Sequence, residues 1–195
     1  RGPDDSGYEL FDFENSQVGF GFRRLSILDL SPAGHQPMHF EEAGLTAMLN
    51  GELYNFAEVK TELEKLGHTF KSRSDTEVLL KAYAQWGIAG IHRFRGMFAI
   101  AILDRKNEQL HLIRDRAGVK PLYYFNDGQH FLFASELKAF HKHPHFLKEI
   151  NTAALSLYFQ HGYIPAPYSI FSRTYKLLPG HYLTISLKSK SVLQK

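Results

Sequence analysis

The sequence predicts an α+β protein in which antiparallel sheets pack against layers of helices. Short strand-like runs between residues 97 and 134 are separated by hairpin-type breaks, which favour antiparallel pairing. Two helix patterns begin at capping boxes. The run Met97–Leu103 is apolar throughout and should therefore be buried on both faces. A sheet buried on both faces needs helices on one side and a second layer on the other.

The first strands of this sheet system are expected in the N-terminal quarter. Val18–Leu28 mixes alternating and apolar residues and predicts one or two strands, which Ser31–Gly34 breaks into a loop. A second apolar run, Leu45–Leu49, stops at Asn50 and Gly51, so we expect a strand that presents polar groups at its tip. Because Asn-Gly is also the strongest short hairpin signal, an ordinary turn is the alternative there.

Two helices follow. Asn55 begins the first with a capping-box acid at Glu58, and Gly67 ends it; Ser74 begins the second in the same way, and Gly87 ends it. The residues that fall on one face of each helix are Phe56, Val59, Leu63 and Leu66 in the first, and Val78, Leu79, Ala82, Tyr83 and Trp86 in the second.

The second half of the chain predicts four short strands and two further helices. The strands are Met97–Leu103, Leu110–Arg114, Leu122–Phe125 and Phe131–Ala134, and the helices are Glu136–Phe140 and Thr152–Gln160. From Tyr163 onward prolines interrupt the pattern, and a polar Lys/Ser segment at the end is typical of a domain edge.

The composition excludes several classes of protein. A chain of 195 residues with 44% hydrophobic residues is long enough for one well-cored domain. The net charge of +3 is mild and the basic residues are interleaved with acidic ones, so nothing indicates nucleic-acid binding. No apolar stretch has the length of a membrane span. The chain has no cysteine, which excludes disulfides and thiolate metal sites within it and is compatible with a cytoplasmic location.

The residues around Asn50 suggest a pocket for an amino acid. Glu52 and Asp75 are suited to an ammonium group, and Arg24 can bind a carboxylate with its bidentate fork. The N–H of Gly51, with no side chain beside it, can donate to an oxyanion. Each residue also has an ordinary interpretation: a surface arginine, a solvated glutamate and a helix N-cap aspartate.

Motifs along nearly the whole chain, in order, resemble the class II glutamine amidotransferase domain of the asparagine synthetase family. They are RGPDDSG (residues 1–7), RRLSILDLS (23–31), AGHQPM (33–38), NGELYN (50–55), SDTEVLLKAY (74–83), GMFAIAILD (96–104), RDRAGVKPLYY (114–124), ASELKA (134–139) and LPGHYL (178–183).

The resemblance implies the fold called the N-terminal nucleophile hydrolase sandwich, with four αββα layers of antiparallel sheets and helices. It also implies roles for the residues singled out above. The α-carboxylate of glutamine would be held by Arg24, the α-amino group by Glu52 and Asp75, and the oxyanion by the Asn50 side chain and the Gly51 N–H. The stretch after the arginine, Leu25, Ser26, Ile27 and Leu28, would line the same pocket.

The family reaction is amide hydrolysis through a thioester on an N-terminal cysteine, which this chain lacks. Ser6 and Ser26 cannot replace it, because the nucleophile's own α-amine is the general base. We therefore expect residues 1–187 to be a glutaminase domain without its first strand and helix, inactive alone, and residues 188–195 to begin a linker. A synthetase domain using ATP and magnesium would follow and choose the acceptor, aspartate or another acid.

Some alternatives stay open. A nucleophile-less descendant could keep the pocket as a glutamine sensor, or serve as a scaffold for a partner synthetase; a homodimer is a further open arrangement. No cofactor is expected in this domain. His141, His143 and His145 alternate, but Pro144 breaks the segment and no carboxylate-rich motif stands nearby, so no metal site is predicted.

Overall fold

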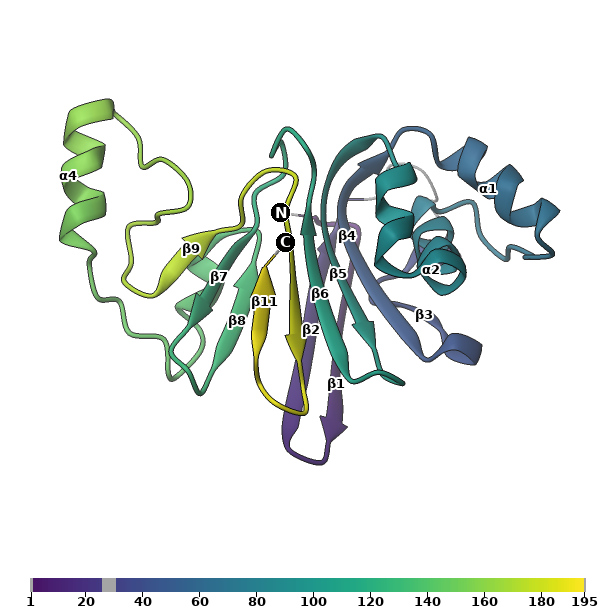
Figure 1. Ribbon diagram of the computed structural model, residues 1–195, viewed down its shortest axis with the longest axis horizontal. Coiled ribbons are helices and arrows are strands. Elements are labelled where there is room, and N and C mark those ends of the chain that lie inside the picture. The colour runs from purple at the N-terminus through teal and green to yellow at the C-terminus, as the bar shows by residue number, and fades with distance from the viewer. Residues whose placement is uncertain (1, 26–30, 195) are drawn as a thin grey trace.

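The computed structural model describes residues 2–25 and 31–194. A six-stranded antiparallel sheet forms the centre of the molecule (Figure 1). Its strands, in spatial order, are β11 (Val192–Gln194), β10 (Tyr182–Ser186), β6 (Gln109–Arg114), β5 (Gly96–Asp104), β4 (Leu45–Leu53) and β3 (Met38–Phe40). β5 is buried from Phe98 to Asp104, so the prediction that this run is covered on both faces is confirmed.

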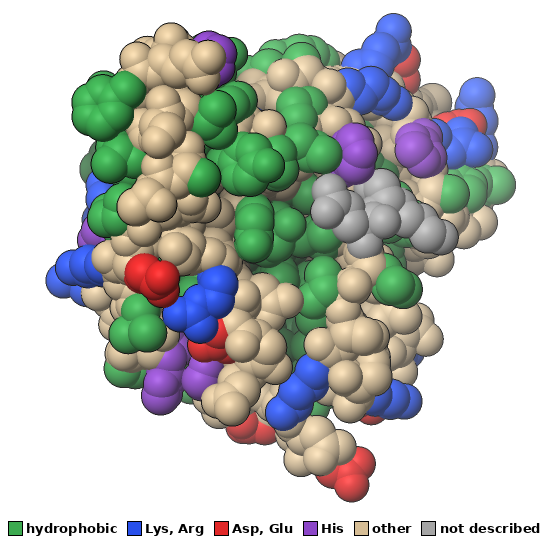
Figure 2. Space-filling view, turned by 60° about the vertical axis from the view of Figure 1, so that its left-hand side comes forward, with side chains coloured by type: hydrophobic (Ala, Val, Ile, Leu, Met, Phe, Trp, Pro, Cys, Tyr) green, Lys and Arg blue, Asp and Glu red, His purple; other side chains and the backbone are tan. Residues whose placement is uncertain are grey.

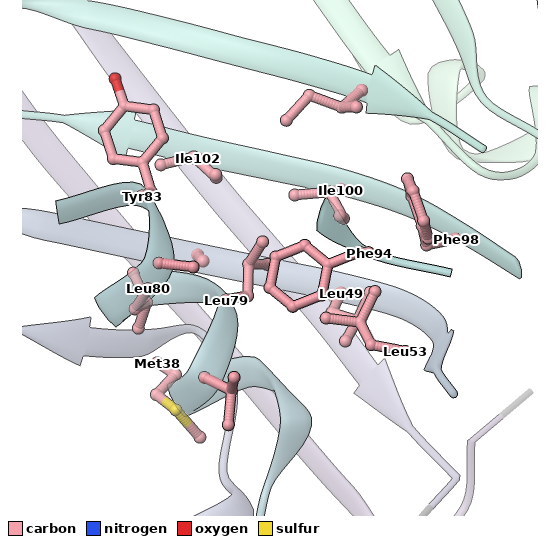
Figure 3. Close-up of a cluster of buried hydrophobic side chains, with 14 of the residues drawn as sticks. Met38, Leu49, Leu53, Leu79, Leu80, Tyr83, Phe94, Phe98, Ile100 and Ile102 are labelled. Atoms are coloured by element: carbon pink, nitrogen blue, oxygen red, sulfur yellow. The ribbon is translucent and has the colours of Figure 1, made fainter. Parts of the chain in front are cut away.

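One face of this sheet is covered by α1 (Phe56–Lys65) and α2 (Asp75–Trp86), followed by the 3₁₀ segment η3 (Gly87–Arg93) (Figure 1). The helix side chains pack against the sheet in a cluster that includes Leu79, Phe94 and Ile100 (Figure 3). Every residue from Asp75 to Tyr83 is buried, which makes α2 the central helix of this layer.

The opposite face packs against a second layer, which consists of two separate sheets. The first is the hairpin of β1 (Asp5–Phe13) and β2 (Ser16–Arg24); the second has the order β8-β7-β9, with β8 (Phe131–Ala134), β7 (Tyr123–Asn126) and β9 (Thr174–Lys176). Both contribute to one core, as shown by the edge-to-face contact of the Phe20 and Phe133 rings, whose centroids are 5.9 Å apart. Among the described strands, β2 pairs only with β1 and β8 only with β7.

The remaining elements are short or peripheral. The helix α3 (Leu137–Phe140) packs on the face of β8 that points away from this core, through a cluster that includes Phe125. The helix α4 (Thr152–His161) lies at the edge of the molecule (Figure 1). The 3₁₀ turns η1 (Pro32–Gly34) and η2 (Glu41–Ala43) flank β3. No helix among the described residues is long and apolar enough to cross a membrane.

Most predicted elements are present, and the differences have local causes. The helix after Asn55 forms without a side-chain cap, because the Asn55 amide instead donates to the Arg93 carbonyl and accepts from the Arg95 N–H. Ser74 does cap α2, through the Thr76 N–H. Residues 192–194, in the stretch predicted to begin a linker, pair with β10; the domain boundary at residue 187 stays a prediction.

Candidate functional site

Strand β4 carries three of the predicted site residues, Asn50, Gly51 and Glu52, in succession. The sequence predicted that the strand ends there, with a turn as the alternative, and both predictions are wrong. β5 matches β4 residue for residue, with Gly51 opposite Phe98, so the strand continues to Leu53. The polar residues therefore sit on a rigid paired strand, which is a more exact support than a loop.

Gly51 is required here by the packing of the two strands. Its φ of 145° lies in a region that side chains rarely adopt. A Cβ at this position would lie 2.0 Å from the carbonyl oxygen of Met97 and 2.7 Å from the Cα of Phe98. Any larger residue would have to push β4 and β5 apart.

The N–H of Gly51 points away from β5. The N–H of Phe98 donates to Asp115 Oδ2 at 3.2 Å, and the Phe98 carbonyl accepts from the Asp115 N–H at 2.9 Å. Both polar groups of Phe98 are thus used on the side opposite β4. The facing pair Gly51–Phe98 is consequently a non-hydrogen-bonded pair of the antiparallel ladder, and the Gly51 N–H faces the other edge of β4.

No described strand pairs with that edge beside Gly51, because β3 pairs with β4 only from Leu45 to Ala47. Two side chains satisfy the N–H groups on either side: Leu49 donates to Gln36 Oε1 at 2.8 Å, and Leu53 donates to Asp75 Oδ2 at 3.1 Å. Between them, no described residue accepts from the Gly51 N–H. A ligand oxygen can take this position.

Asp75 and Glu52 form a pair of like charges beside this N–H. Asp75 is the first residue of α2 and is buried, and burial raises the pKa of its carboxyl group. The Leu53 and Thr76 N–H groups act in the opposite direction, and the negative charge of Glu52 raises the pKa further. A cation bound between the two carboxylates would relieve their repulsion, so the pair is suited to binding an ammonium group.

The Asn50 side chain lies on the opposite face of β4 from Gly51, by the alternation of the strand. Its Nδ2 donates to Ser135 Oγ at 2.9 Å. Ser135 directly follows β8, so this hydrogen bond joins the six-stranded sheet to the second layer. An amide nitrogen carries two hydrogens, and the contact with Ser135 uses one of them.

Arg24 ends β2 and is buried, whereas Arg23 beside it is exposed. Arg24 faces Asp5 in the hairpin register. The pKa of Asp5 is lowered chiefly by its hydrogen bond with His35, and the charge of Arg24 adds to this effect. Leu25 follows the strand and is exposed. The predicted pocket residues Ser26, Ile27 and Leu28 lie outside the described residues.

Gln36 connects β4 to α2, although its sequence position gave no sign of this role. It is buried, and besides accepting from Leu49 it donates to Thr76 Oγ1 at 3.2 Å, next to Asp75. The preceding residue, His35, pairs with Asp5 at 2.7 Å, which ties the β1–β2 hairpin to the same loop. Gln36 and Ser135 both fall within motifs that resemble the family, which was the only signal for either.

Of the three histidines considered for a metal, His143 and His145 lie close to each other and to His130, which the sequence did not single out. The rings of His130 and His145 stack with centroids 4.1 Å apart, and that of His143 lies 5.7 Å from His145. Within residues 2–25 and 31–194, no group of three His, Cys, Asp or Glu side chains has an arrangement that could hold a metal ion.

Two solved structures share the fold of this chain. The glutamine phosphoribosylpyrophosphate amidotransferase of Bacillus subtilis matches 91% of this chain and 34% of its own length, with a TM-score of 0.64 and 21% identity. A second structure, described as the allosteric regulatory enzyme of purine biosynthesis, matches with a TM-score of 0.62. The predicted fold class, the N-terminal nucleophile hydrolase sandwich, is confirmed.

Sequence comparison identifies the family. All 195 residues match the family model described as a glutamine amidotransferase domain. A putative asparagine synthetase (glutamine-hydrolyzing) 2 of Methanocaldococcus jannaschii is 40% identical over 98% of this chain, and the asparagine synthetase (glutamine-hydrolyzing) 2 of B. subtilis is 42% identical over 96%. The chain belongs to the glutamine amidotransferase domain family. It spans only 40% and 25% of the lengths of these two relatives.

Proposed function

We propose that this domain binds L-glutamine and releases its amide nitrogen as ammonia for a glutamine-dependent asparagine synthetase or a close homologue. The observation that carries the proposal is the group on β4 and α2: an N–H without a described acceptor at Gly51, the amide of Asn50, and the carboxylates of Glu52 and Asp75. These are the groups that a γ-amide with an α-ammonium requires. The named relatives, both described as glutamine-hydrolyzing, support the choice of substrate.

The residues are assigned as follows. The carboxylates of Glu52 and Asp75 bind the α-ammonium group, and Arg24 binds the α-carboxylate as a charge-assisted pair. A thiolate attacks the amide carbon, and the resulting oxyanion accepts from Asn50 Nδ2 and the Gly51 N–H. The C–N bond breaks as the nitrogen takes a proton and leaves as ammonia. Water then hydrolyses the thioester to glutamate.

The nucleophile has to come from outside residues 1–195, which contain no cysteine. A cavity of about 640 Å³ lies between β2 and β8, and its lining includes Gln17 and Gly19 from the start of β2 and His130 and Phe131 at the start of β8. The two strands therefore run in the same direction, and both end at the site: β2 at Arg24, and β8 next to the residue that contacts Asn50.

A strand inserted between β2 and β8 and antiparallel to both would have its first residue at the site. This supports the proposal that an N-terminal cysteine reaches the glutamine amide from this slot, with its α-amine as the base. For the rest of the whole protein we propose a synthetase domain that uses ATP and magnesium, and a location in the cytoplasm. The acceptor acid is chosen by that domain.

Two substitutions in the whole protein test the roles. Asp75→Ala should mainly raise KM for glutamine, because it removes one ammonium partner. Asn50→Ala should lower kcat for glutamate release by about a hundredfold, as expected for the loss of one oxyanion donor. Synthesis supported by added ammonium salt bypasses the pocket and is the control. If both variants changed only KM, the assignment of Asn50 to the oxyanion would be wrong.

The sensor and the scaffold remain the alternatives, and glutamine itself distinguishes them. A sensor would gain stability on adding L-glutamine while releasing no glutamate. A scaffold would show neither effect. The N-terminal sequence and intact mass of the natural protein would establish at the outset whether a cysteine begins the mature chain.

A further inference from the structure

The helix α4 lacks the packing that a helix of its length needs. Of its ten residues only Ala154 is buried, and none of the other described helices and strands packs extensively against it. Phe159 is 79% exposed, and Tyr158 beside it is also exposed. In Figure 1 the helix stands at the outer edge of the molecule, beyond β9.

Local interactions hold only the two ends of α4. Asn151 accepts from the Ala154 N–H at 3.1 Å, and Gly162, with a φ of 76°, donates to the Tyr158 carbonyl at the other end. Isolated helices shorter than about 12 residues are marginal in water, and most helix stability in proteins comes from packing of an apolar face. The exposed aromatic side chains of α4 therefore require a partner.

The exposed apolar surface continues beyond the helix. Tyr168 pairs with Tyr175 of β9 in an isolated bridge, and Ile150 pairs with Phe171 in another, so the segment after α4 folds back beside it. We call the resulting surface the α4 face; its exposed residues are Ile150, Tyr158, Phe159, Tyr163, Tyr168 and Tyr175. Figure 2, which brings this side of the molecule forward, shows hydrophobic side chains gathered over it.

Most of the α4 face comes from a segment without charged residues. Residues 150–172 contain no Lys, Arg, Asp or Glu, although these residues make up 22% of the chain. Solvated surfaces are rich in charged residues, whereas the buried parts of permanent interfaces are depleted of them and enriched in Tyr and Phe. The composition matches a surface that is covered permanently, not one that exchanges transient partners.

The length of the relatives indicates what covers it. This chain corresponds to 40%, 25% and 28% of the lengths of three asparagine synthetases, so most of such a polypeptide lies outside residues 1–195. A body tethered to this domain meets the α4 face at an effective concentration far above that of a free protein. A tethered body is thus the first candidate to cover an apolar face.

We propose that the α4 face is the interface on which the remaining part of the same polypeptide, the synthetase body, is permanently seated. This extends the proposed function by naming the surface that joins the ammonia-releasing domain to the acceptor domain. The interface is built from the aromatic side chains of α4 and the Tyr163–Tyr175 segment, with hydrophobic and not ionic complementarity. It should form whether or not glutamine is hydrolysed.

The test places a photo-crosslinking residue at position 159 of the whole protein. Equal amounts of ¹⁴N- and ¹⁵N-labelled protein are mixed and irradiated, and the cross-linked peptides are identified by mass. The proposal expects peptides from outside residues 1–195 that carry the same isotope as the α4 peptide. Mixed-isotope pairs would show a second copy on the face, and the absence of cross-links would show an uncovered face; either result overturns the proposal.

A charge substitution gives a second measurement. In the whole protein, Phe159→Glu should raise hydrogen-exchange rates of α4 amides by about tenfold or more, because the seated body is loosened. The matched control is Leu66→Glu, an exposed apolar residue at the end of α1 on the other side of the molecule, which should leave α4 exchange unchanged. Equal exchange in wild type and Phe159→Glu would count against the interface. Glutamate release, measured in parallel, reports on the proposed function separately.

Discussion

At the scale of single residues, the pocket depends on groups that position the reacting ones. Asn50 can stabilise an oxyanion only if its nitrogen, and not its oxygen, faces the substrate. The hydrogen bond from Asn50 Nδ2 to Ser135 Oγ holds the amide in place and leaves the second hydrogen of Nδ2 for the substrate. Ser135 is therefore a positioning residue in the proposed reaction.

The prediction is that Ser135→Ala lowers kcat for glutamate release by about fivefold with KM nearly unchanged, because one hydrogen bond of about 1 kcal/mol positions the amide. Ser135→Thr keeps the hydroxyl group and should restore most of the activity. Steady-state kinetics of the whole protein, at saturating and limiting glutamine, separate the two constants. A rise in KM alone would mean that Ser135 shapes the pocket and does not orient Asn50.

Asp75 leads to a prediction about pH. Burial, with the charge of Glu52, raises the pKa of this carboxyl group, and only its ionised form pairs with an ammonium group. The affinity for glutamine should therefore fall as pH decreases through the raised pKa of Asp75. The Asp75→Asn variant should bind glutamine roughly tenfold to a hundredfold more weakly at neutral pH and lose this pH dependence.

The carboxyl group of Asp75 should also make the stability of the fold depend on pH, but with stability decreasing as pH rises. Because the folded protein keeps the Asp75 proton to higher pH than the unfolded chain, the free energy of unfolding should decrease as pH rises from the ordinary value of 3.8 through the raised pKa, and then level off. Asp75→Asn should remove this decrease. KM against pH and hydrogen exchange against pH, for wild type and variant, are the two measurements. A variant that is less stable at neutral pH would show that Asp75 is structural.

At the scale of elements, the segment Arg114–Lys120 fixes the N-terminal end of β5 through hydrogen bonds with Phe98. Asp115 is buried, and its two oxygens accept from the N–H groups of Phe98, Ala117, Val119 and Lys120. Burial alone would raise the pKa of Asp115, but these N–H groups outweigh it and the pKa is lowered. The arginines on either side, Arg114 and Arg116, donate to main-chain carbonyls, so this charge cluster is structural.

Asp115→Asn should lower the free energy of unfolding by about 3 kcal/mol, since the amide nitrogen would face two N–H donors. The stabilisation by Asp115 is complete above the ordinary pKa of 3.8 and is lost as pH falls through the lowered one, so the difference between wild type and variant should shrink in acid. Hydrogen exchange of the β5 and β6 amides measures it. Asp12→Asn, on the exposed end of β1, is the control, with an expected change within about 0.5 kcal/mol.

The elements that the sequence predicted correctly are those with a strong signal of their own, such as the capped apolar face of α2 and the continuous apolar run of β5. The errors arise where contact with a segment distant in the sequence determines the local structure. β4 continues through Asn50-Gly51 because β5 pairs with it, and Asn55 is used by the Arg93–Arg95 segment instead of by its own helix. β1 was not predicted at all. Its exposed face carries apolar Tyr8 and Leu10, which obscures the alternation expected for a half-buried strand.

The candidate site likewise contains residues that the sequence could reveal and residues that only the structure reveals. Asn50, Gly51, Glu52 and Asp75 could be selected from the sequence because their chemistry suits a zwitterion, and the structure brings them together around one edge of β4. Their assigned roles stay predictions. Gln36 and Ser135 could not be selected, because they act through hydrogen bonds to other site residues and have no chemistry of their own to reveal them.

At the scale of the whole molecule, the second layer is divided along the slot between β2 and β8. Leu10 lines this slot and is 64% exposed. The lining also includes apolar residues of both sheets, such as Val18 and Phe133, together with polar ones such as Gln17. An exposed edge of this kind is rare in stable proteins, which pair or cover their edge strands. In the proposed function, the strand that carries the nucleophile fills the slot.

If the slot is filled in the whole protein, the substitution Leu10→Asp should destabilise the fold more than the exposure of Leu10 suggests. If the slot stays open, Leu10→Asp is a surface change and should alter the free energy of unfolding by no more than about 0.5 kcal/mol. If another segment covers it, a carboxylate is buried without a partner, and the cost should be about 2 kcal/mol or more. We expect the larger cost in the whole protein.

The control is Leu66→Asp, which introduces the same charge at a leucine that is 54% exposed and lies outside the slot. Hydrogen exchange of the β4 and β5 amides measures both variants on the same core. A large cost for Leu10→Asp together with a small one for Leu66→Asp supports a covered slot, since the two sites differ in position more than in chemistry. Equal small costs would place the nucleophile elsewhere and would require a different route for it to the amide beside Gly51.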